Sequence, residues 1–134
     1  MADKTMHVEV VSAEQHVLSA DITELYARSV EGEIGILPGH QPAVIALDIG
    51  PVRMTLADGT KESIAVHRGV LFVDQAGKAI VLADIAELGS EVDVARAEAR
   101  KQQLEQRLAT EEDAVVRASL RKQQLRLDVA EHSS

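Results

Sequence analysis

The sequence predicts a sandwich or barrel of antiparallel β-strands followed by a C-terminal antiparallel α-helical hairpin. The first observation is that all eight glycines lie at or before Gly89, and all three prolines at or before Pro51. Because these residues mark turns, the chain should be rich in turns first and uninterrupted helix later. The second is that apolar residues recur at every second position before Gly89 and about every 3.6 positions after it. We therefore expect a sandwich domain at 1–88 and a two-helix domain at 89–134.

The strands are predicted from apolar residues that alternate with polar ones. Residues 6–10 and 52–56 alternate strictly, and residues 64–66 resume the alternation after Asp58-Gly59, a dipeptide typical of hairpin turns. Many short strands joined by short turns are typical of an antiparallel sandwich or barrel. Further short apolar runs lie at 43–47, 70–73 and 80–82.

The two helices are predicted within residues 90–131, with a break near 109–113. Ser90 is the expected cap of the first helix and Thr110 that of the second, each followed three residues later by an aspartate suited to the first turn. The apolar stripes of the two helices are thin. Since most helix stability comes from packing an apolar face, we expect the hairpin to be weakly held and able to open. The stripes are Val94, Ala97, Leu104 and Leu108, then Val115, Ala118, Leu125 and Val129.

Composition excludes several classes of protein. The chain has 22 acidic and 14 basic residues, which argues against binding a nucleic-acid backbone. It has one tyrosine and one phenylalanine, too few to stack single-stranded bases, and no cysteine for a disulfide or zinc site. No apolar run approaches the length of a signal peptide or a membrane span, so we expect a soluble intracellular protein.

The stretch EGEIGILPGHQP at 31–42 is the most unusual in the chain. No lysine follows its glycines, so it is not a phosphate-binding loop. The five histidines are scattered, so no metal site is expected at His40. The residues alone leave open a sharply turned surface loop, with Glu33 a solvated carboxylate, or an enzyme that uses His40 with an acid.

Several stretches together resemble the epsilon subunit family of the F-type ATP synthase. They are EGEIGILPGHQP, VVSAEQHVLSADI at 10–22, VLADIAEL at 81–88 and VDVARAEARKQQLEQRL at 92–108. They follow in order and cover essentially the whole chain. The resemblance implies a ten-stranded sandwich with a helical hairpin, no catalytic residues and no required cofactor. It also implies a peripheral place on the cytoplasmic face of the bacterial cell membrane, within the complex.

The resemblance further implies a rotor subunit of the central stalk, which couples the c-ring to the gamma subunit. Glu33 and His40 would then face gamma and the c-ring loops. In many bacterial members the hairpin opens, meets the alpha and beta subunits and blocks ATP hydrolysis. The inhibitory basic face would consist of Arg117, Arg121, Lys122 and Arg126.

ATP is implied as a regulatory ligand, because some members bind it through a motif of the form I/L-D-x-x-R-A. Residues 92–97 match this motif except that Val92 replaces Ile or Leu. Gln103 and Lys122 stand where those members have arginines, and since lysine lacks the bidentate guanidinium, weaker binding is expected. The nucleotide-binding residues would be Glu87, Asp93, Arg96, Ala97 and Arg126.

Two other interpretations remain for these residues. Asp93 is also explained as an ordinary first-turn acid and Arg96 as a solvated side chain. The whole chain is also explained as a free-standing β-sandwich binding module with a helical tail, unrelated to the synthase.

Overall fold

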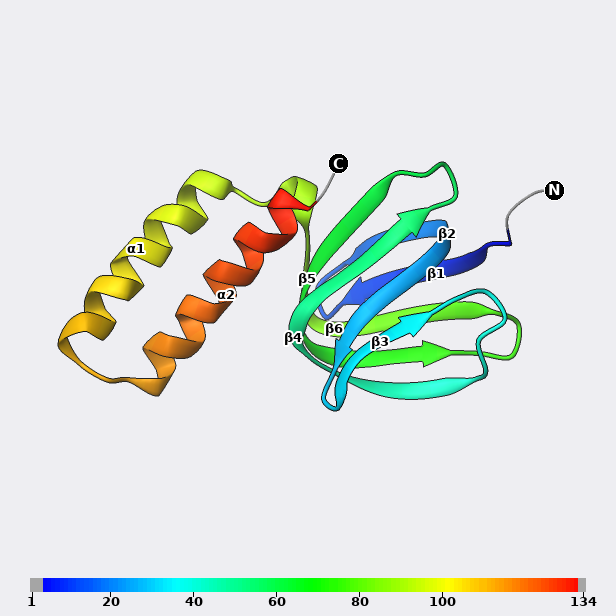
Figure 1. Cartoon of the computed structure of the whole chain (residues 1–134), viewed down its shortest axis with the longest axis horizontal. Coiled ribbons are helices and arrows are strands. Elements are labelled where there is room, and N and C mark those ends of the chain that lie inside the picture. Colours follow the sequence, from blue (N-terminus) through cyan, green and yellow to red (C-terminus); the bar gives the residue numbers. More distant parts are fainter. Residues whose placement is uncertain (1–3, 133–134) are drawn as a thin grey trace.

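A computed structural model of the chain describes residues 4–132 and shows a β-domain beside a pair of helices (Figure 1). Within these residues there are six strands, one 3-10 turn and two α-helices. The elements are β1 (Met6–Ser12), β2 (His16–Ser29), β3 (Gly32–Ile36), β4 (Ala43–Leu56), β5 (Lys61–Val73), β6 (Lys78–Leu88), η1 (Gly89–Glu91), α1 (Val94–Thr110) and α2 (Ala114–Glu131).

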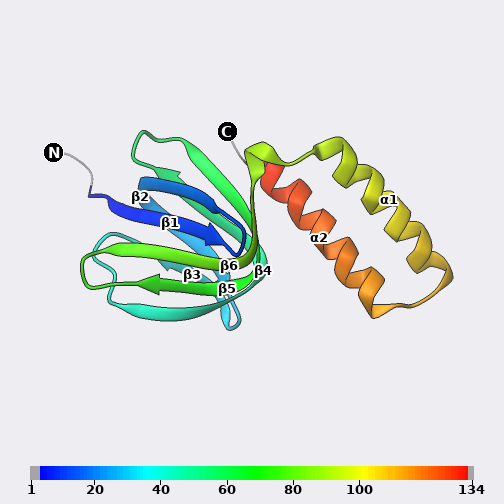
Figure 2. The same ribbon diagram turned by 180° about the vertical axis from the view of Figure 1, so that it is seen from behind.

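The strands form one sheet that closes on itself. Their order is β1-β6-β5-β4-β2-β3, and β1 also pairs with β2. The β1–β6 pair is parallel, and the others are antiparallel. Figures 1 and 2 show β4 and β5 bending as they pass from one layer of the sandwich to the other. β3 pairs with β2 alone, so its outer edge is left unpaired among the described residues.

The predicted sandwich is confirmed, but the count of ten strands is wrong. The segments 43–47 and 52–56, predicted as separate strands, are the two ends of β4. The pairing with β5 keeps one register from Ala43 opposite Val73 to Thr55 opposite Lys61. A glycine and a proline therefore bend β4 where a turn was predicted. In the same way β5 contains both 64–66 and 70–73.

The bend of β5 brings its backbone very close to β6. Arg68 has a φ of 57°, in the left-handed region that few residues other than glycine adopt. The next residue is Gly69, and a Cβ added there would lie 2.2 Å from the carbonyl oxygen of Leu82. The close approach of the two strands therefore requires a residue without a side chain at position 69.

The core follows the predicted alternation. Met6, Val8 and Val10 of β1 are buried, and the intervening side chains are not. Apolar side chains from every strand fill the space between the layers. The largest completely buried ones in the sandwich are Ile22, Leu25, Ile36, Ile64 and Leu71.

The helical hairpin is confirmed, but each helix is capped three residues later than predicted. Asp93, not Ser90, caps α1 by accepting a hydrogen bond from the amide of Arg96 at 3.1 Å. Asp113, not Thr110, caps α2 through the amide of Val115 at 2.8 Å. A short polar side chain in extended conformation is the usual N-cap, and aspartate serves as well as serine or threonine.

The helix α2 lies between α1 and the sandwich (Figures 1 and 2). Leu125 and Val129 of α2 form a small apolar cluster with Ala65 of β5, and the partly buried Ile49 and Val92 pack against it. The stripes are thin, as predicted. Val94 and Val115 are at least half exposed, and Val116 is buried where Val115 was predicted.

Candidate functional site: the hairpin cleft and its junction with the sandwich

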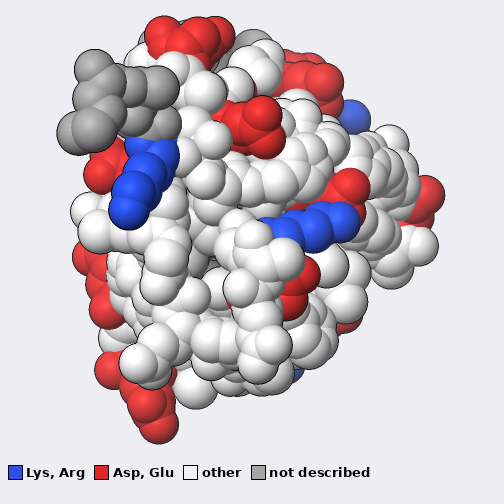
Figure 3. Space-filling model, turned by 90° about the vertical axis from the view of Figure 1, so that its right-hand side faces the viewer, with Lys and Arg blue, Asp and Glu red and all other residues white. Residues whose placement is uncertain are grey.

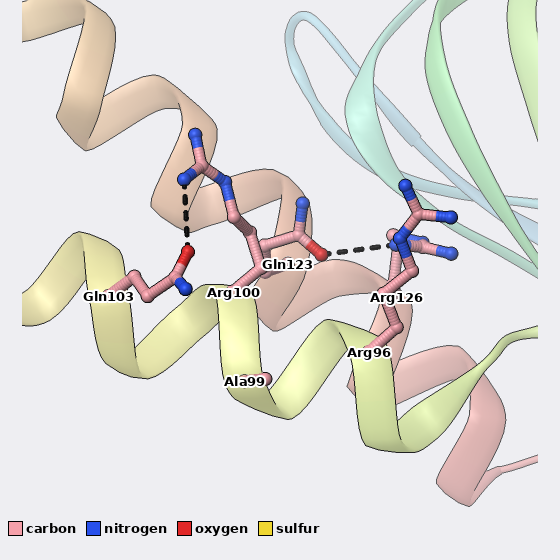
Figure 4. A pocket seen from close by; sticks show the side chains of 6 residues that line it. All are labelled: Arg96, Ala99, Arg100, Gln103, Gln123 and Arg126. Atoms are coloured by element: carbon pink, nitrogen blue, oxygen red, sulfur yellow. Dashed lines mark hydrogen bonds between the residues drawn. The ribbon is translucent and has the colours of Figure 1, made fainter.

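A cleft of about 520 Å³ lies between α1 and α2 near their junction with the sandwich. It brings together Arg96 and Arg126, which lie on different helices and were predicted to share a site. Figure 4 shows their guanidinium groups close to each other, with Arg100 further along α1. The lining residues are Arg96, Ala99, Arg100, Gln103, Gln123 and Arg126. Three guanidinium groups make this cleft suitable for an anion.

Arg126 is bound to the sandwich by a bidentate ion pair. Its Nε and Nη2 donate to the two carboxylate oxygens of Glu87, at 2.7 and 3.0 Å, and its Nη1 donates to Gln123 Oε1 at 3.1 Å. The hydrogen bonds from Arg126 to Glu87 raise the pKa of the guanidinium above its ordinary value. Glu87 is thus placed to hold Arg126 when the cleft has no anion, and an anion would compete with it.

Three members of the cleft, Ala99, Arg100 and Gln123, were missed from the sequence. Arg100 lies one turn after Arg96 on the same face of α1, and its Nη1 donates to Gln103 Oε1 at 3.3 Å. The spacing of four residues could have identified it. Gln123 comes from α2 and carried no sequence signal. Gln103, where an arginine was expected in nucleotide-binding relatives, does line the cleft.

Asp93 and Ala97 have structural positions in α1. The Asp93 carboxylate caps the helix, and Ala97 is completely buried. A methyl group at this position allows α1 to approach α2 closely. Neither residue lines the cleft between the helices.

The four basic residues of α2 do not lie on one face. Lys122 and Arg126 line a cavity of about 380 Å³ between α2 and β6. Arg121 lines a separate groove of about 690 Å³, together with Arg28 and Arg68. Arg117 lies nearer the hairpin turn and donates through Nε to Glu112 at 3.1 Å. The helix thus has two pairs of basic residues on opposite flanks.

The two residues predicted for the rotor interface lie away from the cleft. Glu33 is exposed on the edge strand β3, so the first part of the predicted loop is in fact a strand. His40 follows β3, and its Nδ1 lies 2.6 Å from the carbonyl oxygen of Gln41, as in an ordinary loop histidine. His40 lines a pocket with the β5–β6 turn at the end of the sandwich away from the helices. Figure 3 shows this end, where acidic side chains are spread around the rim.

The comparisons with known proteins agree on one family. The family model described as "ATP synthase, Delta/Epsilon chain, beta-sandwich domain" matches residues 5–89. The chain is 41% identical over 109 residues to the ATP synthase epsilon chain of Pelotomaculum thermopropionicum, covering 81% of this chain and 80% of that one. It is 45% identical over 109 residues to that of Carboxydothermus hydrogenoformans, covering 81% and 79%.

Solved structures show the same fold at lower identity. A chain of the Euglena gracilis mitochondrial ATP synthase is 19% identical, with a TM-score of 0.69, covering 95% of this chain and 78% of that one. A chain of the Tetrahymena thermophila central stalk and c-ring is 11% identical, with a TM-score of 0.57, covering 96% of both. These two likenesses concern the fold alone.

The sandwich and its family match define a chain of the delta/epsilon class. The identities to the curated relatives extend past the sandwich into the helices. The chain belongs to the epsilon chain family of ATP synthase, whose members are non-catalytic subunits of the complex. Within residues 4–132, neither α-helix is both long and apolar enough to cross a membrane. In the same residues, no group of three or more histidine, aspartate and glutamate side chains is arranged to hold a metal ion.

Proposed function

We propose that the chain is a rotor subunit of the bacterial F-type ATP synthase, in which the sandwich joins the gamma subunit to the c-ring. The hairpin is the regulatory part. It lies on the sandwich in a closed state and, when it opens, contacts the alpha and beta subunits and resists ATP hydrolysis. In this role the chain needs no cofactor and is held peripherally at the cytoplasmic face of the membrane by the complex.

The narrow junction between α2 and the sandwich carries this proposal. The apolar contact consists mainly of Leu125 and Val129 on Ala65. The polar contacts include the Glu87–Arg126 pair, a longer Arg53–Asp128 pair at 3.4 Å, and a hydrogen bond from Ser63 to the carbonyl of His132 at 3.2 Å. A junction of this size holds the hairpin by a few kcal/mol, the range in which a partner shifts a population.

The stalk assignment is tested by purification with the gamma subunit. A rotor subunit forms a stable complex with gamma, and the complex should survive removal of the hairpin because the sandwich makes the contact. A free-standing binding module would elute separately from gamma under the same conditions.

The charge of Glu33 is expected to contribute to the contact with the c-ring. Glu33→Lys should weaken binding to the c-ring about threefold to tenfold at low salt, because attraction to basic loops becomes repulsion. Glu14→Lys is the matched control, since Glu14 is exposed in the β1–β2 turn, outside β3 and its following loop. Binding of isolated c-ring by each variant, measured at rising salt, checks this. Equal losses in the two variants would contradict a role for Glu33.

A second candidate function is regulatory binding of ATP in the cleft between α1 and α2. The convergence of Arg96, Arg100 and Arg126 supports it, because guanidinium groups recognise phosphates by bidentate hydrogen bonds. Asp93 and Ala97 support the site indirectly, by starting α1 and by bringing the helices together. Gln103 leaves the far side of the cleft without a further charge.

Calorimetric titration with ATP tests this site. We expect Arg96→Ala, Arg100→Ala and Arg126→Ala each to weaken binding about tenfold, which corresponds to the loss of one charge-assisted hydrogen bond. Arg107→Ala is the control, since Arg107 lies in the last turn of α1, outside the cleft lining. If the wild-type chain takes up no ATP at millimolar concentration, the cleft has another role.

A further inference from the structure

His67 of β5 is the one buried ionisable side chain in the described sandwich that has an unpartnered polar atom. It is 9% exposed, and its Nδ1 is buried with no hydrogen-bond partner within residues 4–132. The ring lines the cavity between β6 and α2, on the flank of α2 that carries Lys122 and Arg126. An unsatisfied ring nitrogen is costly to bury, so its position beneath α2 requires an explanation.

The surroundings of the ring favour its neutral form. Burial lowers the pKa of His67, Lys122 lowers it further, and Arg126 acts in the same direction, while Glu87 opposes them. The Glu87 carboxylate already accepts hydrogen bonds from Nε and Nη2 of Arg126. Other charged groups of the packed elements are Glu91 of η1, in the same cavity, and four that line the groove on the other flank of α2: Asp48, Arg68, Arg121 and Asp128.

We propose that His67 is a proton sensor for the hairpin: the ring is neutral while α2 is closed over it, and its protonation favours release of α2 from the sandwich. An imidazolium carries an N–H on both nitrogens. In the closed state the Nδ1–H would be buried without an acceptor, beside two cations of α2. Both costs disappear when α2 leaves, because water reaches the ring and Lys122 and Arg126 depart with the helix.

The direction of the pH effect follows from linkage. The open state has an exposed ring with an ordinary pKa of about 6.5, and the closed state has a lower one. The open state therefore binds more protons between these two values. The closed state keeps its full stability above about pH 6.5 and loses it as the pH falls towards the lower pKa. The ratio of closed to open chains falls up to about tenfold for each unit that separates the two values.

This inference rests on the part of the proposed function that requires the hairpin to open, but not on inhibition of hydrolysis. The first test follows opening directly by energy transfer between dyes on the full chain. Because the chain has no cysteine, Ala57→Cys on the sandwich and Ala109→Cys on α1 give two unique and exposed labelling sites. We expect the closed-state efficiency seen at pH 8 to shift towards that of the open state as the pH falls below about 6.5.

Two variants identify His67 as the group responsible. His67→Phe keeps a ring but does not titrate, so it should abolish this shift, and His67→Arg should give the open efficiency even at pH 8. His132→Gln is the matched control, because His132 follows α2 and its Nδ1 lies 2.8 Å from the carbonyl of Asp128. The control should keep the wild-type pH dependence. A constant wild-type efficiency, or equal shifts in wild type and His67→Phe, would overturn the proposal.

An NMR titration of the wild-type chain provides a second readout that does not depend on the variants folding. The ring protons of His67 should titrate below the ordinary imidazole pKa of about 6.5. Lys122→Met should move the His67 titration upwards, since it removes the cation while keeping the helix. A His67 titration at or above the ordinary pKa of about 6.5 would overturn the sensor even if the hairpin opens, so this failure is separable from failure of the proposed function.

Discussion

Ending the chain at Gly89 is expected to raise ATP hydrolysis by the reconstituted core enzyme about fivefold or more, a typical coupling between two sites. Removal of α1 and α2 deletes the part that would reach the alpha and beta subunits. ATP synthesis should change little, because the sandwich keeps its own core, and the helices contribute only a small cluster to it. The measurement compares hydrolysis and synthesis rates of enzyme assembled with either chain. Equal recovery of the gamma subunit is the control for assembly.

The basic residues of α2 should account for part of this rise. Opposite charge between these residues and an acidic segment of the beta subunits would hold the open state. Arg126→Ala would also remove the Glu87 pair that holds the closed state, so its effect on hydrolysis mixes two causes. Arg117 and Arg121 make no ion pair with the described sandwich, and their double alanine variant therefore reports on the open state alone. If truncation leaves hydrolysis unchanged, the hairpin is no inhibitor, and the basic residues are solvated flanks of α2.

The architecture was predictable because local signals agreed with each other. Glycine and proline are absent after Gly89, and this alone separates helix from strand. The number of strands was not predictable, because the same residues bend a strand and end one. Gly50-Pro51 lies between two alternating segments, and only the pairing of β4 with β5 shows that the strand continues. Bends of this kind depend on the neighbouring strand, which no local pattern contains.

The site could be predicted where a motif determined it. Arg96 and Arg126 were placed together by resemblance, and the hairpin does bring them to one cleft. The N-caps were misplaced because each candidate segment has two capping residues three apart, and only the extended conformation of the second identifies the true one. His67 had no signal at all. Its importance comes from burial beneath α2, a tertiary contact between residues far apart in the chain.

The close approach of the β5 backbone to β6 at Gly69 leads to the largest expected effect on stability. Gly69→Ala should lower the free energy of unfolding by about 3 kcal/mol, because the new methyl group would clash with the backbone of β6. Its position would be 2.2 Å from the carbonyl oxygen of Leu82 and 2.9 Å from the Cα of Ala83. A side chain could rotate away from such a contact, but these atoms belong to the strand ladder that β5 forms with β6. Relief requires separation of the two strands, which would break hydrogen bonds near the bend at Arg68.

Gly35→Ala is the matched control for this prediction. Gly35 lies in β3, and its new methyl group would meet Tyr26, with Cε1 of the ring at 2.7 Å. The ring is 39% exposed and is free to turn towards solvent, so the expected loss is below about 1 kcal/mol. Urea unfolding of both variants, with equal slopes required for the comparison, measures the difference. Comparable losses of unfolding free energy in the two variants would mean that β5 and β6 separate easily. The bend of β5 would then result from the Arg68 conformation rather than from close packing against β6.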